Sequence, residues 1–80
     1  MYQRIVFMQG DEATEPLDIL NRDGVDAAIE YLAQWDMEPG ESFDEPASGE
    51  SDDVHETDDG YRMSWNQRYG YIGLERILNH

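Results

Sequence analysis

A short stretch rich in carboxylates is the part of this sequence most capable of chemistry. Residues 48–61 read SGESDDVHETDDGY, with one histidine, His55, and no basic residue. The six acids of this stretch are Glu50, Asp52, Asp53, Glu56, Asp58 and Asp59. Such oxygens could bind a cation, present negative charge to a basic partner, or simply keep a loop in solvent.

Calcium is the first ligand to consider, because it takes about six to eight oxygen ligands. Asp52, Asp58 and Gly60 have suitable chemistry, but the spacing is not that of an EF-hand, which needs acids at alternating positions and a terminal glutamate. For transition metals, the only histidine besides His55 is His80, and there is no cysteine. We therefore expect no metal and no cofactor, and weak calcium binding remains the last alternative.

Catalysis is not predicted. Ser51 and His55 supply the residue types of a nucleophile and its base, but a solvated loop does not hold them in a reactive geometry. Paired carboxylates perform acid–base chemistry only where burial separates their pKa values. The sequence has no phosphate-binding loop, dinucleotide fingerprint or nucleophile elbow. We expect a protein that is not an enzyme.

The charge predicts the kind of partner. The 80 residues contain 19 acids and five arginines, which gives a net charge of −14. Residues 36–60 alone hold eleven acids and no base. This field repels nucleic acid, whose binding requires cationic contacts to phosphate. It attracts basic proteins, so we predict a basic protein partner and no direct contact with nucleic acid.

The length and the hydropathy pattern predict one small domain, residues 1–80. No apolar run exceeds four residues, at positions 5–8. A membrane-spanning helix needs about 20 apolar residues and a secretory signal about 7–15. We therefore expect a soluble, cytoplasmic protein with no membrane partner.

Three segments have the alternation of β-strands. Residues 2–9 read YQRIVFMQ, and residues 61–66 and 71–78 read YRMSWN and YIGLERIL. The last two predict a β-hairpin closed by a turn around NQRYG. In its first strand, Tyr61, Met63 and Trp65 share one face, opposite Arg62, Ser64 and Asn66.

A helix is predicted from residue 25 to about residue 36, because apolar residues recur there at intervals of three and four. Asp23 is the expected N-cap, and EPG at 38–40 is the expected end. Residues 10–16 are interpreted as a turn because of Gly10 and Pro16. Residues 17–20 are interpreted as a second short strand or the approach to the helix.

These elements predict the α+β class: a small antiparallel sheet of three to four strands, with one amphipathic helix packed on one face. Residues 38–59 are predicted to form a long acidic loop that is mobile, because self-repelling acids with few apolar anchors do not offset the entropy of ordering. Phe7, Trp35 and Trp65 are the aromatic residues expected in the core.

Two candidate binding surfaces follow. The acidic surface combines the helix residues Asp26 and Glu30 with the six loop acids, one helical turn of about 5.4 Å separating the first two. The aromatic surface is Tyr31, Tyr61, Tyr69 and Tyr71, because tyrosine is enriched at protein interfaces. The alternative is that these tyrosines are ordinary half-buried sheet residues.

The leading hypothesis is a small acidic binding protein that engages a basic partner as an inhibitor, either as a nucleic-acid mimic or as an immunity-type protein. An alternative is a salt-adapted soluble domain that binds a protein partner, or forms a homodimer, through the aromatic C-terminal hairpin. Salt separates the two, because a charge-driven complex weakens as salt rises and a salt-adapted domain becomes more stable.

Overall fold

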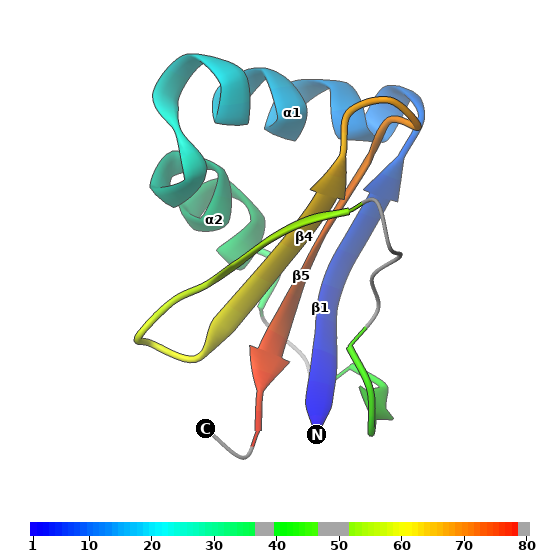
Figure 1. The fold of residues 1–80 in the computed structure, drawn as a ribbon, viewed down its shortest axis with the longest axis vertical. Helices are drawn as coiled ribbons and strands as arrows, with labels where there is room; N and C mark the ends of the chain where they lie inside the picture. Colours follow the sequence, from blue (N-terminus) through cyan, green and yellow to red (C-terminus); the bar gives the residue numbers. More distant parts are fainter. Residues whose placement is uncertain (37–39, 47–51, 79–80) are drawn as a thin grey trace.

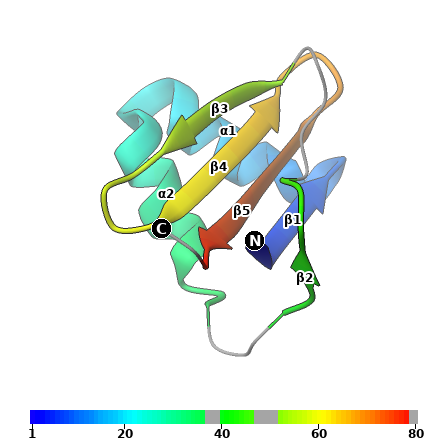
Figure 2. The ribbon, with the colours of Figure 1, turned by 60° about the horizontal axis from the view of Figure 1, so that its bottom comes forward.

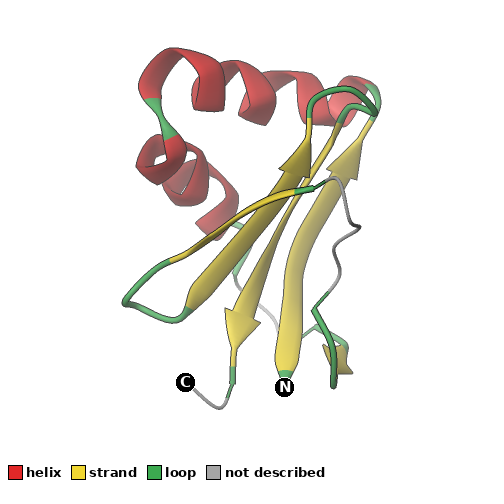
Figure 3. Ribbon diagram, in the orientation of Figure 1, coloured by secondary structure: helices red, strands yellow, loops and turns green. Residues whose placement is uncertain are grey.

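The protein folds into an antiparallel sheet with two helices on one face, as a computed structural model describes it for residues 1–36, 40–46 and 52–78 (Figures 1 and 3). The elements in chain order are β1 (Tyr2–Gln9), α1 (Asp11–Asp23), α2 (Val25–Ala33), β2 (Ser42–Phe43), β3 (Asp53–Glu56), β4 (Tyr61–Asn66) and β5 (Tyr71–Ile77). The five described strands have the order β2-β1-β5-β4-β3, and each neighbouring pair is antiparallel (Figure 2).

The predicted α+β class is confirmed, together with the strand at residues 2–9, the hairpin β4–β5 and the helix that begins at Val25. In the hairpin, Met63 lies opposite Leu74 and Trp65 opposite Ile72. The described part of the chain contains five strands and two helices, where the sequence predicted three to four strands and one helix.

The turn and short strand expected over residues 10–20 are wrong, because this segment forms α1. Ala13, Pro16 and Leu20 are buried, at intervals of three and four, which is the spacing of one helical face. Acids at Asp11 and Glu12 lie in the first turn, where the helix dipole favours negative charge. Pro16 lies beyond the first turn and removes a helical hydrogen bond, but its ring is among the fully buried side chains.

Gly24 is the single residue between the two helices. Its φ of 101° suits glycine far better than any other residue, its amide donates to Leu20 O at 3.1 Å, and its carbonyl accepts from the Ala28 amide at 3.2 Å. The predicted N-cap is therefore wrong: Asp23 is the last residue of α1, and Gly24 occupies the cap position of α2.

The helix α2 ends at Ala33, earlier than predicted, and two of the predicted core rings are not in the core. Trp35 follows the helix and is 40% exposed, and Phe7 on β1 is 45% exposed. Of the expected helix stop at 38–40, residues 38–39 lie outside the described residues.

The core lies between the helices and the sheet. Its fully buried members include Met63, Ile72 and Leu74 from the hairpin and Leu32 from α2. Trp65 is partly buried against them. Each such side chain contributes about 1.5–3 kcal/mol when removed from water, so the hairpin and α2 stabilise each other.

On the sheet face away from the helices, several polar side chains are buried. Arg62, Ser64, Asn66 and Glu75 all have less than 9% of their surface exposed. Arg62 Nη1 donates to Glu75 Oε1 at 3.2 Å, and its guanidinium lies 5.9 Å from the centre of the Tyr2 ring. The alternation of β4 therefore separates an apolar face from a polar one, and both faces carry buried side chains.

The acidic segment 38–59 contains two strands that were not predicted, β2 and β3. β3 pairs with β4 from Asp53 opposite Trp65 to Glu56 opposite Arg62. The described part of this segment thus supplies both edge strands of the sheet, β2 on one side and β3 on the other, and is not a structureless loop. Residues 47–51, on which the predicted mobility also falls, lie outside the described residues.

Candidate functional site

Four of the predicted partner-binding acids line one hollow on the surface, which we call the acidic hollow. They are Asp26 and Glu30 on α2, with Asp58 and Asp59 in the turn between β3 and β4. Its volume is about 470 Å³, and Ile29, Ala33 and Tyr61 give it an apolar floor. Two segments far apart in the sequence therefore present carboxylates to the same space.

The α2 side of the acidic hollow is fixed by packing. Ala28, Ile29 and Leu32 are buried in the core. Asp26 and Glu30 are one turn apart and exposed, so the helix places them on its outer side. A helix anchored by its opposite face holds these two carboxylates at a constant separation.

The β3–β4 turn side is fixed by hydrogen bonds. The Thr57 amide donates to Tyr61 O at 2.8 Å, and the Tyr61 amide donates to Thr57 Oγ1 at 3.1 Å. The Gly60 amide donates to Thr57 O at 3.2 Å, and the Ile77 amide donates to Gly60 O at 2.7 Å. Asp58 and Asp59 are therefore carried by a turn that is tied both to itself and to β5.

None of the described residues that line the acidic hollow is basic. The arginines lie elsewhere against other groups: Arg22 on Asp23, Arg62 on Glu75, Arg76 on Asp36, Arg4 over the Phe43 ring and Arg68 over the Tyr69 ring. Arg76 lies close to one lining residue, since its guanidinium is 5.2 Å from the centre of the Tyr61 ring. Its ion pair with Asp36 occupies it, and Tyr61 donates its hydroxyl to the same carboxylate at 3.2 Å.

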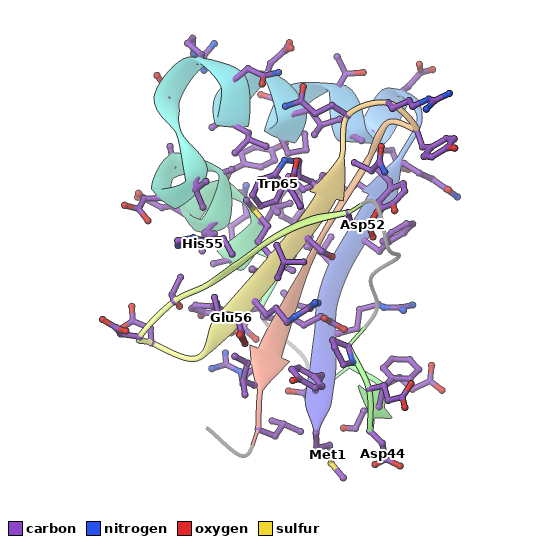
Figure 4. All side chains as sticks on the ribbon, in the orientation of Figure 1. Met1, Asp44, Asp52, His55, Glu56 and Trp65 are labelled. Atoms are coloured by element: carbon purple, nitrogen blue, oxygen red, sulfur yellow. The ribbon has the colours of Figure 1, made fainter. Side chains whose placement is uncertain are left out.

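The other predicted acids are distributed along β3. Asp53 and Glu56 are exposed and lie on opposite faces of the strand, because side chains alternate along it. By the same alternation, His55 shares the face of Asp53. Asp52 lies at the far end of β3 from the acidic hollow (Figure 4). Glu50 lies outside the described residues.

Asp52 is part of a structural network. It accepts hydrogen bonds from the Tyr71 hydroxyl and from Asn66 Nδ2, the latter at 3.3 Å. The hydrogen bond to Asp52, together with burial, raises the pKa of the Tyr71 phenol above its ordinary value. These two side chains stabilise each other where β3 meets the hairpin.

The four tyrosines of the predicted aromatic surface lie in four different places. Tyr61 borders the acidic hollow, and Tyr69 is 67% exposed in the β4–β5 turn. Tyr71 packs against Phe7 with ring centres 5.8 Å apart. Tyr31 packs edge-on against Trp35, 5.1 Å between centres. Burial raises the pKa of Tyr31, and the neighbouring Glu15 carboxylate adds to this.

Of the three aromatic residues that do gather, Tyr31 was among the predicted site residues, and Phe7 and Trp35 were not. Phe7, Tyr31 and Trp35 line a second hollow of about 410 Å³ beside β1. One signal for it is visible in the sequence, since an unusually large number of aromatic residues for a small core implies exposed rings. It did not indicate which rings, because that depends on the strand order.

The described residues were compared with the requirements of a metal site and of a membrane-spanning helix. Among them, no group of three or more His, Cys, Asp or Glu side chains is arranged to hold a metal ion. None of the described helices has both the length and the apolar character needed to cross a membrane.

Comparison of the chain with protein-family models, with curated proteins and with solved structures found no match in any of the three.

Proposed function

We propose that this chain is a small non-catalytic binding protein whose acidic hollow engages a basic protein. The observation that carries the proposal is the convergence of four carboxylates, from α2 and from the β3–β4 turn, on one open hollow with no base in its lining. A single-sign concave surface concentrates the field and attracts a cationic partner. The apolar floor suits the methylene stem of an arginine or lysine side chain.

The rigidity of both sides supports an inhibitory role. A protein that imitates the phosphates of a nucleic acid must hold its carboxylates in place, because mobile charges lose ordering entropy on binding. Asp26 and Glu30 stand on a packed helix, and Asp58 and Asp59 on a hydrogen-bonded turn. An immunity-type protein that covers a basic toxin would use the same arrangement.

The test uses two variants of equal charge. One carries Asp26→Asn, Glu30→Gln, Asp58→Asn and Asp59→Asn. The control carries the same number of neutralised exposed acids away from the hollow: Asp18→Asn, Glu41→Gln, Asp44→Asn and Glu45→Gln. Each set of four changes takes the net charge of −14 to −10.

The three proteins would be used to capture partners from a nuclease-treated lysate of the host and eluted with rising salt. A basic protein retained by the parent and by the control, lost by the hollow variant and released as salt screens the charges, is the expected result. Equal loss in both variants would show that only net charge matters. If the same protein is captured at every salt concentration and by both variants, the result would favour the salt-adapted alternative.

A further inference from the structure

The outer edge of β1 is open beyond its first residues. β2 pairs only with Tyr2 and Gln3, and the Arg4 amide then donates to Glu41 O at 3.1 Å. From Ile5 to Gln9, the described residues provide no strand on this side, while β5 covers the other side up to Gln9. Figure 1 shows β2 beside only the N-terminal end of β1.

The backbone of Phe7 and Gln9 points to this open edge. The amide of Gly10 donates to Gly70 O at 3.1 Å, on the β5 side. In an antiparallel ladder, the backbone N–H and C=O groups of successive residues point to alternate sides of the strand. The backbone groups of Met8 therefore point to β5, as the amide of Gly10 does, and those of Phe7 and Gln9 point outward. Both are exposed residues.

The second hollow, which we call the edge hollow, lies directly against this edge. It is lined by Val6, Phe7, Met8, Tyr31 and Trp35, and Glu12 is the one charged residue among the described residues of its lining. An exposed strand edge with apolar neighbours invites pairing, and soluble proteins usually protect it with charges, proline or a bulge. The bulge here lies at Ile5, between Arg4 and Val6, and so leaves Phe7 and Gln9 unprotected.

We propose that the outer edge of β1 binds an extended segment of a protein partner as an additional strand, with a basic side chain directed at Glu12. Backbone groups of Phe7 and Gln9 supply the ladder, and side chains of the added strand alternate between two faces. On the helix side, an apolar residue enters the edge hollow against Trp35, and the basic residue two positions away reaches Glu12. The residue between them packs on Phe7.

Charge complementarity selects this occupant over a second copy of the chain. A second copy carries the same net charge of −14 and the same acids, Asp11, Glu12 and Glu15, at the start of α1. Like charges brought together cost association free energy. The proposal shares with the proposed function only the basic character of the partner, since its location and its backbone chemistry are independent of the acidic hollow.

The probe is the end-blocked peptide Thr-Thr-Val-Tyr-Arg-Thr-Thr, titrated into the labelled protein and followed by the NMR shifts and hydrogen exchange of backbone amides. We expect the amides of Phe7 and Gln9 to shift and to become protected from exchange. The control peptide, with glutamate in place of arginine, should bind at least about fivefold more weakly.

Two protein variants separate backbone pairing from side-chain contact. Gln9→Pro removes an outward donor without touching the β1–β5 ladder, because proline is tolerated where the N–H faces solvent. It should weaken binding at least about tenfold, whereas Gln9→Ala should change it less than about twofold. Glu12→Arg, an exposed helix substitution that does not threaten the fold, should reverse the preference between the two peptides.

Each contrary result is informative. Equal binding by Gln9→Pro and Gln9→Ala, with Glu12→Arg showing unchanged preference, overturns the proposal. Self-association of the parent that Gln9→Pro abolishes would assign the edge to a second copy instead. Shifts confined to the acidic hollow would overturn the edge proposal and leave the proposed function standing, whereas edge shifts that survive neutralisation of the four hollow acids would separate the two sites.

Discussion

Carboxylates are used in opposite ways in two regions of this molecule. On the sheet face away from the helices, Glu75 is buried, with 5% of its side chain exposed, and accepts a hydrogen bond from Arg62. In the acidic hollow, Asp26, Glu30, Asp58 and Asp59 share one space with no base among the lining residues.

The pairing of Glu75 suits a carboxylate that stabilises the fold, whereas the four carboxylates of the acidic hollow are arranged as the proposed binding role requires. A buried carboxylate is tolerated only when it is paired, so Glu75 and Arg62 depend on each other. Exposed carboxylates that repel one another add little to stability and keep their attraction for an external cation. Net charge alone does not distinguish the two uses.

The largest expected effect is on the buried pair. Glu75→Ala removes the Glu75 carboxylate from the buried Arg62 and should lower the free energy of unfolding by about 3–5 kcal/mol. Urea denaturation followed by circular dichroism measures this. A loss below about 1 kcal/mol would mean that water replaces the carboxylate at Arg62, and the contrast with the acidic hollow would then disappear.

Replacing both partners sharpens the same comparison. Arg62→Met combined with Glu75→Leu removes both charges and should recover most of the lost stability, to within about 1–2 kcal/mol of the parent. The difference between this double variant and the single one, measured in the same urea series, gives the cost of removing the Glu75 carboxylate while the Arg62 charge stays buried. A double variant as unstable as the single one would instead assign the loss to packing.

Neutralising the acidic hollow should have the opposite sign and a smaller size. The variant with Asp26→Asn, Glu30→Gln, Asp58→Asn and Asp59→Asn relieves repulsion and should raise the melting temperature by about 1–4 °C at low salt. The gain should vanish near 1 M salt, where the Debye length is about 3 Å. A decrease in the melting temperature would show that these acids stabilise the fold, which would count against a binding role.

The smallest effect concerns Tyr71, whose pKa is raised above 10.0 by its hydrogen bond to Asp52 and by burial. Because the folded pKa exceeds the unfolded one, this contribution to stability is present below pH 10 and is lost as pH rises through the folded value. Asp52→Asn should bring the titration of Tyr71 down, as phenolate absorbance measures it. Tyr71→Phe identifies that transition by removing it, and an unchanged titration in Asp52→Asn would exclude the interaction.

Periodic apolar segments were predictable from the sequence. β1, the hairpin and the start of α2 follow from alternation and from helical spacing. The helix α1 was missed because Gly10 and Pro16 suggested a turn, although Ala13, Pro16 and Leu20 have helical spacing. β3 was missed because Val54 is its only apolar residue, and its pairing with β4 rather than its own propensity stabilises it.

The site was predictable in its composition but not in its geometry. Asp26, Glu30, Asp58 and Asp59 all belong to the predicted acidic set, yet their shared hollow depends on the β3–β4 turn lying beside α2. The edge hollow depends on which strand lies beside β1 and on how far it extends. β2 occupies that side and pairs only with Tyr2 and Gln3, so it leaves Phe7 exposed. Tertiary neighbours of this kind leave no local pattern in a sequence.

The position of β5 also has a consequence for how the chain reaches this structure. β5 is the middle strand of the sheet and the last of the described elements, and it bonds to β1 on one side and to β4 on the other. β1 precedes β5 in the chain, so β1 has no central strand to join until nearly all the described chain has been synthesised. Closing a loop of this length makes the first productive encounter slow. During that interval the edge of β1 that later joins β5 is unpaired, so the nascent chain is more open to misassociation than the finished fold.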